Sequence, residues 1–458
     1  MPAFSLEPQQ TAWGAQLRSL AAQRLRPLAE KGEPGRVNRP LVAELGRLGL
    51  LTRLFDSGAL DLCLMRENLA YACTEAETAL ALQGLGAHPV HAHGTPAQRD
   101  RWLPRVADGT AIAAFALSEP GAGSDAAALA LRADAERDAV ASAASAAAAE
   151  PGAVRNTGDG GGRYGGGGEG SGGARSSGGV GGDGPVRRDA RGVGPDAVPG
   201  PVLGAVPAAE RDGLRRWRLT GEKCWISNAP EADFYTVFAR TTPGAGARGV
   251  TAFLVPADRP GLTGSALEML SPHPVGALRF DAVPVTADDV LGETDRGFRV
   301  AMGTLNLFRP SVGAFAVGMA QAALDAALHH TRGRDAFGGR LMDLQTVAHR
   351  VAEMALRTDA ARLMVYAAAT AYDEAAPDVP MRAAMAKLLA TETAQYVVDA
   401  AVQLHGARAL RRGHLLEHLY REVRAPRIYE GASEVQRGII AKELYAMNAA
   451  PHSPQEAP

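Results

Sequence analysis

The last third of the chain consists of long stretches in which apolar residues recur every three or four positions. They run from Gly297 to about Met447 and include SVGAFAVGMAQAALDAALHH and MRAAMAKLLATETAQYVVDAAVQLHG. This spacing places the apolar side chains on one face of a helix. Because the helices are long and their connections short, we expect an antiparallel four-helix bundle over residues 291–447 and a flexible tail at 448–458.

Two other patterns precede this bundle. Residues 1–110 show helical spacing, as in QLRSLAAQRLRPLAE, and predict an N-terminal helical domain. Short β-branched and aromatic runs, such as FYTVFAR and GVTAFLVPA, follow between Gly, Pro and Asp turns and predict a middle β domain over 111–290. The expected fold class is therefore α+β.

A low-complexity insertion interrupts the β domain at about residues 134–214. It is rich first in Ala and then in Gly, as in ASAASAAAAE and GDGGGRYGGGGEGSGG, with almost no large apolar residue. Such a segment buries too little apolar surface to offset the entropy of ordering, so we expect it to be disordered. Its glycines neither follow a strand nor open a helix, which argues against a Rossmann dinucleotide site.

Composition argues against several classes of protein. The net charge of −2 gives no overall basic field for nucleic acid or an anionic membrane, and the N-terminus has no signal-peptide pattern. We expect no membrane-spanning helix and a cytoplasmic location. The three cysteines have no CxxC spacing, and the histidines of GAHPVHAHGT fit no common metal site, so we expect no disulfide framework and no metal.

Two motifs in the β domain could contact a ligand. The segment LSEPGAGSD at 117–125 follows an apolar strand, and its tight turn could hold a polar ring edge or a phosphate, although most such strings are only turns. The segment GEKCWISN at 221–228 places Trp225 beside hydroxyl-bearing Ser227 on a strand. A tryptophan in a strand is usually a core residue, so this motif alone predicts no function.

A third motif, RIYEGASEVQR at 427–437, offers a candidate base. Glu430 precedes a helix that Ser433 could cap. Desolvation by Ile428 and Tyr429 would raise the pKa of this carboxyl and suit it to abstract a proton. The alternative is a solvated loop carboxylate.

In their order, these motifs resemble the acyl-CoA dehydrogenase family over essentially the whole chain apart from the insertion. QLHG at 403–406, Arg309-Pro310 at the expected head of a bundle helix, and RDAFG at 334–338 add to the resemblance. It implies a helical N-terminal domain, a β-barrel-like middle domain and a C-terminal four-helix bundle. It also implies an enzyme that uses FAD to remove hydrogens from the α and β carbons of an acyl-CoA thioester.

The resemblance also assigns roles to individual residues. Glu430 corresponds to the catalytic base; one branch of the family has its base just before the Arg-Pro pair, where this chain has Phe308, which cannot accept a proton. The implied flavin contacts are Phe115, Leu117, Ser118, Trp225, Ser227, Ser433 and Glu434. The implied contacts with the adenine-diphosphate half of a neighbouring subunit's cofactor are Arg334, Phe337, Gln345, Gln403 and Gly406. The implied substrate contacts are Ser124, Thr241, Asn306, Arg309, Tyr429 and Gly431, with Arg309 as the phosphate or pantetheine partner.

Other features of the site stay open at this point. The helix from Tyr71 to Leu85 corresponds to the wall of the acyl pocket, with Glu77 facing it, although Glu77 could also be a solvated surface acid. The family implies a homo-oligomer, a tetramer in most members, and an electron-transferring flavoprotein as acceptor. The alternatives are an acyl carrier protein as substrate carrier, an oxidase or oxygenase of the same fold, and a flavin-binding scaffold without activity.

Overall fold

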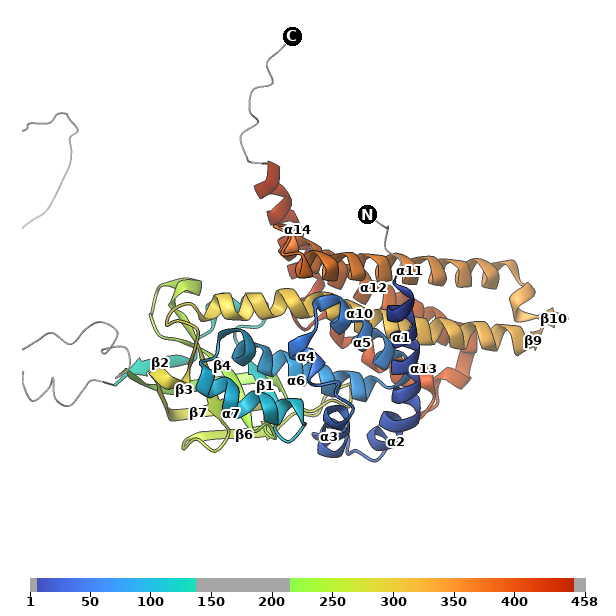
Figure 1. The fold of residues 1–458 in the computed structure, drawn as a ribbon. Helices are drawn as coiled ribbons and strands as arrows, with labels where there is room; N and C mark the ends of the chain where they lie inside the picture. The colour runs from blue at the N-terminus through green and yellow to red at the C-terminus, as the bar shows by residue number, and fades with distance from the viewer. Residues whose placement is uncertain (1–5, 137–214, 449–458) are drawn as a thin grey trace, which may run out of the picture. The chain divides into compact units, whose positions relative to one another are not determined.

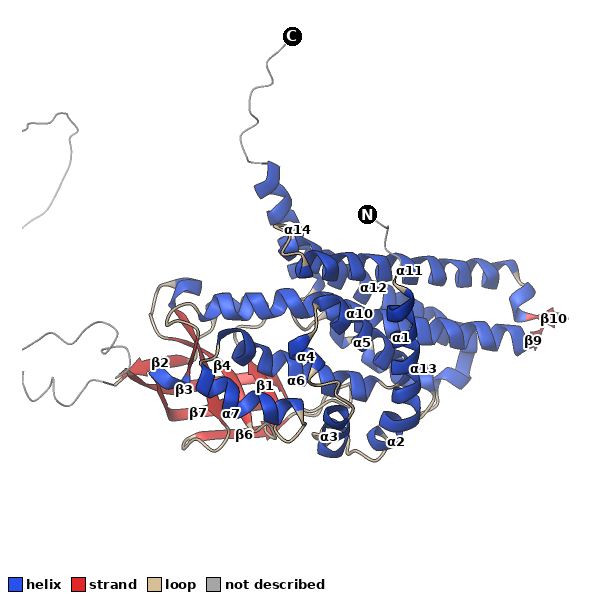
Figure 2. Ribbon diagram, viewed as in Figure 1, coloured by secondary structure: helices blue, strands red, loops and turns tan. Residues whose placement is uncertain are grey.

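The computed structural model describes residues 6–136 and 215–448. Helices, then a sheet, then long helices follow one another along the chain (Figure 1). The strands of the large sheet gather at one side of the described part, and a small two-stranded sheet lies at the opposite end (Figure 2). This confirms the α+β class. The expected disordered insertion lies outside the described residues from position 137 onward, whereas Asp134 and Ala135 pair within a strand, so the insertion begins later than expected. The expected tail lies outside them from position 449 onward.

The N-terminal helices begin with recognisable capping residues. The Asn38 side chain accepts a hydrogen bond of 3.1 Å from the Leu41 N–H, and Thr95 and Gln98 exchange hydrogen bonds at the start of a later helix. The helix expected from Tyr71 to Leu85 is confirmed from Thr74 onward, but its start is wrong, because Cys73 is extended and separates two helices there. The elements are α1 (Pro8–Leu20), η1 (Ala21–Leu25), α2 (Arg26–Ala29), α3 (Arg39–Arg47), α4 (Arg53–Asp56), α5 (Ala59–Ala72), α6 (Thr74–His93) and α7 (Pro96–Ala107).

The middle of the chain forms a mixed sheet in the order β6-β7-β3-β2-β4-β5-β8, with β1 added in parallel to β4. The insertion separates β2 and β3, which are antiparallel neighbours. The apolar runs that predicted strands are β4 and β5, both almost wholly buried. The strands are β1 (Ala113–Ala116), β2 (Arg132–Ala135), β3 (Arg216–Ser227), β4 (Phe234–Arg240), β5 (Val250–Pro256), β6 (Leu262–Ala266), β7 (Val275–Thr286) and β8 (Val290–Leu291), with the short turns η2 (Ala126–Ala128), η3 (Gly246–Gly249) and η4 (Ala287–Asp289).

A bulge in β3 turns Trp225 outward. The pairing of β3 with β7 shifts register between Lys223 and Ile226, and Trp225 has a φ of +58°. Because a bulge inserts an unpaired residue and re-aims its side chain, the indole is 49% exposed. The expectation that this strand tryptophan is a core residue is therefore wrong.

Long helices make up the rest of the chain. The central one, α10, packs against α5, α11 and α12. Its contact with α5 is close, since a Cβ on Gly318 would lie 2.2 Å from the Glu67 carbonyl oxygen. The helices are α10 (Gly297–Gly333), α11 (Gln345–Asp373), α12 (Val379–His405), α13 (Leu415–Glu422) and α14 (Ser433–Asn448), joined by β9 (Asp335–Ala336), β10 (Gly339–Arg340), η5 (Leu341–Asp343), η6 (Gly406–Leu410) and η7 (Ala425–Arg427).

One expectation about α10 is wrong. Pro310 lies inside this helix and does not begin it, and its missing N–H removes one bond from the helical ladder. By length and composition α10 is also apolar enough to cross a membrane, which the sequence reading did not anticipate. However, 78% of its apolar window is buried inside the protein, as in the central helix of a bundle.

Candidate active site

Glu430 lies in the short link between η7 and α14, in a backbone conformation that non-glycine residues rarely adopt. Its φ is +52°, and the next residue, Gly431, has a φ of +95°. This φ of Gly431 strains any residue with a side chain, and a Cβ there would also force Gln436 Nε2, 2.5 Å away, to move. Conformations of this kind cost about 1 kcal/mol or more and persist only where the surroundings impose them.

Three side chains impose this conformation by binding the two backbone carbonyls. Arg309 Nε donates to the Glu430 carbonyl oxygen at 3.1 Å, and Lys387 Nζ donates to the Gly431 carbonyl oxygen at 2.8 Å. Gln436 Nε2 donates to both, at 3.0 and 2.9 Å. We call Arg309, Lys387 and Gln436 the carbonyl clamp. They come from α10, α12 and α14, so three helices fix the position of Glu430.

The Glu430 carboxyl group itself is left without a partner. Its Oε2 is buried and has no hydrogen-bond partner among the described residues. Burial raises the pKa of Glu430, and the nearby cations Arg66, Lys387 and Arg309 oppose this effect. The Glu430 N–H also donates no hydrogen bond within the described part of the chain. An unpartnered carboxyl with a raised pKa can accept a proton from a bound molecule.

A buried ion pair lies beside this carboxyl. Arg66 Nε donates to Glu77 Oε1, and Arg66 Nη1 donates to Ser311 Oγ at 2.7 Å. Glu77 is fully buried, so the reading of it as a solvated surface acid is wrong. Burial raises the pKa of Glu77, and the charge of Arg66 opposes that rise.

Sequence reasoning missed Arg66 as a functional residue. It lies in LDLCLMRENLAYA, where an Arg-Glu pair interrupts a helix that is otherwise apolar. Charged residues in such a run are almost never buried without partners, and that interruption is the signal that could have found them. The neighbouring Glu67 is likewise buried and pairs with Arg362 at 2.9 Å.

The motifs at 117–125 and 221–228 lie side by side in the β domain. The Cys224 N–H donates to the Ser118 carbonyl oxygen at 3.0 Å, which places Trp225 and Ser227 next to the end of β1. Glu119, to which the sequence assigned no role, anchors the turn. Its carboxylate accepts hydrogen bonds from Lys223 Nζ at 2.7 Å and from the Leu131 N–H at 2.9 Å.

The other flavin positions differ in their surroundings. Phe115 packs against Phe238 with ring centroids 4.9 Å apart, and Leu117 is buried. Ser433 is the first residue of α14 and donates its hydroxyl to Glu392 Oε1 at 2.6 Å, so the expectation that it caps the helix through its side chain is wrong. Glu434 is exposed.

The expected substrate contacts are also in varied settings. Arg309 is only 5% exposed and is engaged with the Glu430 carbonyl, which differs from the expected phosphate contact. Thr241 donates to Asp295 Oδ1 at 2.6 Å. Ser124 is exposed, Asn306 is partly buried, and the Tyr429 side chain is 37% exposed.

The five positions expected to contact the adenine half lie near the ends of α10, α11 and α12 or in the links between these helices. Arg334 directly follows the C-terminal end of α10, about 37 Å along the helix axis from Arg309. Figure 1 shows β9 and β10 at the end of the bundle far from the sheet. All five residues are exposed to solvent: Arg334, Phe337, Gln345, Gln403 and Gly406.

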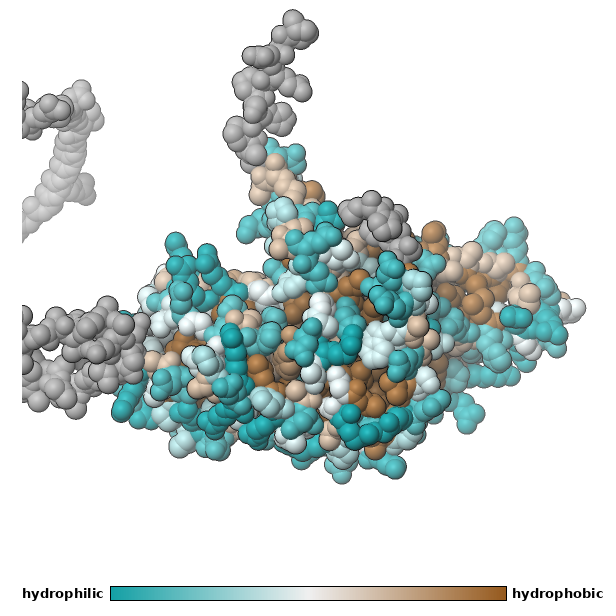
Figure 3. Space-filling model, in the orientation of Figure 1, coloured by the Kyte–Doolittle hydropathy of each residue, from teal (hydrophilic) through white to brown (hydrophobic). Residues whose placement is uncertain are grey.

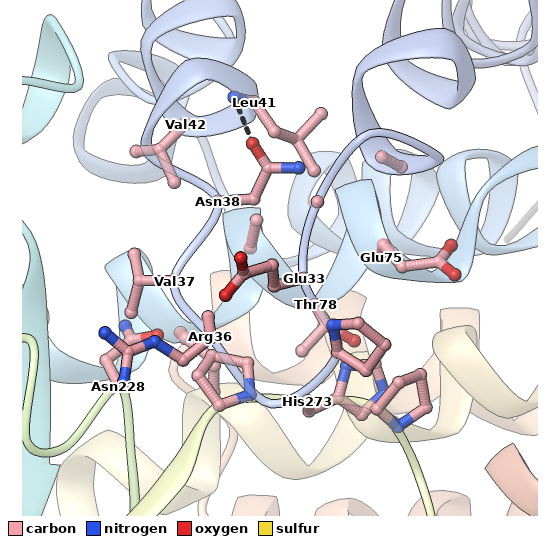
Figure 4. Close-up of a pocket in the computed structure, with 17 residues that line it drawn as sticks. Glu33, Arg36, Val37, Asn38, Leu41, Val42, Glu75, Thr78, Asn228 and His273 are labelled. Atoms are coloured by element: carbon pink, nitrogen blue, oxygen red, sulfur yellow. Dashed lines mark hydrogen bonds between the residues drawn. The ribbon is translucent and has the colours of Figure 1, made fainter. Parts of the chain in front are cut away.

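A small pocket on the other side of α6 is not the active site. It has a volume of about 110 Å³ and is lined by α6, the 29–42 segment and the loop that carries His273, as Figure 4 shows. Glu430 is not among its lining residues. His273 Nε2 lies 2.5 Å from Glu422 Oε2, so a second ion pair joins the lining of this pocket to α13. No group of His, Cys, Asp and Glu in residues 6–136 and 215–448 is placed to hold a metal ion.

Known proteins resemble this chain in sequence and structure. The N-terminal, middle and C-terminal domain models of acyl-CoA dehydrogenase match residues 7–110, 202–283 and 295–445. A probable acyl-CoA dehydrogenase of Mycobacterium bovis is 38% identical over 239 residues, 52% of this chain and 61% of that protein, so this match spans less than two thirds of the relative.

Two further comparisons extend over nearly the whole chain. The mitochondrial short-chain specific acyl-CoA dehydrogenase of Bos taurus is 30% identical over 93% of this chain and 88% of its own length. The solved structure of butyryl-CoA dehydrogenase from Megasphaera elsdenii has a TM-score of 0.75 at 27% identity and covers 96% of this chain and 99% of that chain. This chain belongs to the acyl-CoA dehydrogenase family of oxidoreductases.

Proposed function

We propose that this enzyme carries out the FAD-dependent α,β-dehydrogenation of an acyl-CoA thioester and that Glu430 removes the α-proton. The observation that carries the proposal is the buried Glu430 Oε2, which has no hydrogen-bond partner in the described part of the chain. A carboxyl group that is desolvated and unpartnered is poised to accept a proton from a carbon acid. Phe308 offers no alternative base at the position used by another branch of the family.

The residues around Trp225 fit FAD as the cofactor. The exposed indole on the β3 bulge provides a flat apolar face, and the hydroxyls of Ser118 and Ser227 lie on the two segments joined beside it. A large apolar surface with a few placed polar groups suits a flavin ring. When bound, FAD would accept a hydride from the β carbon.

Glu430 would contribute its backbone as well as its carboxyl. Its N–H has no partner in the described residues and is available to the thioester carbonyl oxygen. A donor aimed at that oxygen stabilises the negative charge that develops there when the α-proton leaves. The carbonyl clamp keeps both groups of Glu430 in position, because it holds the strained backbone at this residue.

We further propose a homo-oligomer, a tetramer as the family implies. The five expected adenine-half positions are exposed, and Arg334 lies about 37 Å along α10 from Arg309, so we propose that they serve the cofactor of a neighbouring subunit. Exposed apolar side chains on the helical part, such as Leu356 and Phe337, support a covered surface there. Figure 3 shows brown, apolar patches over this part. An electron-transferring flavoprotein is the proposed acceptor.

The test is an anaerobic titration of the purified, flavin-loaded protein with a panel of acyl-CoA thioesters, comparing the native enzyme with Glu430→Gln. Bleaching of the flavin in the native enzyme and not in the variant supports the proposal. Reoxidation is then compared between an electron-transferring flavoprotein and dioxygen. If no acyl-CoA bleaches the flavin, the CoA assignment is wrong and the same titration with acyl-carrier-protein thioesters follows.

A further inference from the structure

The buried Arg66–Glu77 pair lies against the reacting end of the site. Its side chains are 4% and 0% exposed and come from α5 and α6. Arg66 also binds Ser311, two residues along α10 from Arg309, which binds the Glu430 carbonyl. The Arg66 guanidinium and the Glu430 carboxylate are close enough to attract each other. The pair therefore lies next to the carboxyl group that would take the α-proton.

The hydrogen bonds of the pair leave a donor unused. Both Glu77 oxygens are engaged, Oε1 by Arg66 Nε and Oε2 by the Thr78 hydroxyl at 3.2 Å. Arg66 uses Nε and Nη1, but its Nη2 has no hydrogen-bond partner among the described residues. A guanidinium has only donors, so the unused position can be filled only by an acceptor.

The charges around this position favour the same kind of group. Three cations, Arg66, Arg309 and Lys387, act on the Glu430 carboxyl group, and Arg66 and His273 act on that of Glu77. When Glu430 takes up a proton, one carboxylate remains among them. An oxygen with partial or full negative charge is stabilised in such surroundings, whereas an alkyl end gains nothing from them.

We propose that Arg66 recognises a hydrogen-bond acceptor on the acyl group, so that the enzyme prefers acyl chains ending in a hydroxyl, carbonyl or carboxylate oxygen over alkyl chains of the same length. This inference rests on the proposed function, which brings the acyl group to Glu430. An alkyl end packed over Arg66 Nη2 would shield this donor from water without giving it a partner, whereas an acceptor would satisfy it. Sites built to bond a substrate oxygen reject analogues that lack it strongly.

The test compares pentanoyl-CoA, ω-hydroxypentanoyl-CoA and the CoA monothioester of pentanedioic acid. Binding of each is measured by calorimetry to flavin-loaded Glu430→Gln protein, in which proton abstraction is blocked, and flavin reduction is measured in the native enzyme. We expect at least one oxygen-ended thioester to be preferred by at least about tenfold over pentanoyl-CoA in binding and in kcat/KM. The hydroxyl-ended thioester tests a neutral acceptor, and the carboxylate-ended thioester tests an anionic one.

Substitutions at the pair assign this preference to Arg66. Arg66→Met should abolish it, and Arg66→Leu/Glu77→Leu, which replaces both charges by apolar groups, should abolish or reverse it. The matched control is Arg362→Met, which breaks the neighbouring buried pair with Glu67 on the same helix and should keep the preference. Flavin content and thermal unfolding show whether each variant is folded.

Each outcome decides the inference. The inference is overturned if Glu430→Gln protein binds pentanoyl-CoA as tightly as, or more tightly than, both oxygen-ended thioesters. It is also overturned if the preference survives in Arg66→Leu/Glu77→Leu. A binding preference without bleaching of the flavin by any thioester would leave the recognition in place and overturn the proposed reaction. Failure of all three thioesters to bind overturns both.

Discussion

Lys387 donates a hydrogen bond of 2.8 Å to the carbonyl oxygen of Gly431, the residue that follows Glu430. The ammonium group is buried, and desolvation lowers its pKa to about 8, an effect that the charge of Glu430 opposes. Lys387 in turn lowers the pKa of Glu430. One side chain thus holds the backbone next to the base and also tunes the base's charge.

We expect Lys387→Met to raise the pH at which flavin reduction becomes half-maximal. The variant loses a cation that stabilises ionised Glu430, so the Glu430 pKa rises and a higher pH is needed to form the active carboxylate. A shift of about one pH unit corresponds to roughly 1.4 kcal/mol of lost interaction. Anaerobic flavin reduction, measured by stopped flow across a pH series with a saturating thioester, gives this midpoint.

Gln436→Leu is the matched control for this charge effect. It removes two hydrogen bonds of the carbonyl clamp but no charge. Its maximal rate should fall because Glu430 is held less firmly, while the midpoint pH stays unchanged. Equal midpoint shifts in both variants would show that the clamp's hydrogen bonds, and not the charge of Lys387, set the pKa of the base.

Glu430→Gln should lose activity and gain stability. The amide cannot accept the proton, so flavin reduction should slow by at least about 100-fold. The ionised carboxyl group of native Glu430 destabilises the fold, because it is buried without a partner. Since the pKa of Glu430 is raised in the folded state, the protein loses stability as pH rises from about 4.3, the ordinary pKa of a glutamate, through the folded-state pKa. The variant should lack this loss. Thermal unfolding of both proteins across a pH series measures this difference. If the melting temperatures of the two proteins depend on pH in the same way, this account is contradicted.

The sequence could predict the residues that act locally. Glu430 and Trp225 lie in short motifs whose order suggested a flavin enzyme, and the α+β class followed from the change in apolar spacing along the chain. The exposure of Trp225 was not predictable, because it depends on a register shift against β7 that no local pattern encodes. Pro310 was placed at a helix start for a similar reason, since tolerance of proline inside α10 depends on its packing.

The supporting residues of the site were not predictable because they act across long distances in the chain. Lys387 binds a carbonyl 44 positions away, and Arg66 binds Ser311 across 245 positions. Each looks like an ordinary helical charge until the helices pack. Sequence spacing reports the periodicity of one helix, and it does not report which helices meet.

Gly431→Ala should destabilise the protein and disturb the base. The added methyl group would meet Gln436 Nε2 at 2.5 Å, and the φ of +95° is unfavourable for alanine. We expect a loss of about 1–3 kcal/mol in the free energy of unfolding, together with slower flavin reduction. Gly438→Ala is the control, since it lies within α14 with no atom within 4 Å of an added Cβ and should stabilise by up to about 1 kcal/mol. Similar denaturation midpoints for the two variants would contradict the strain at Gly431.

The last prediction concerns the ion pair that joins the loop before β7 to α13. Burial lowers the pKa of His273, but Glu422, with smaller effects from Glu75 and Glu77, raises it above its ordinary value overall. A histidine with a raised pKa stabilises the fold fully below its unfolded pKa of about 6.5, and this stability is lost as pH rises through the folded-state pKa. Chemical denaturation should therefore show native stability falling as pH rises above about 6.5. His273→Gln should remove this fall, since glutamine does not titrate and can still donate a hydrogen bond to Glu422. If the variant keeps the same decline, another group titrates there, because only the imidazole of this pair changes charge in that range.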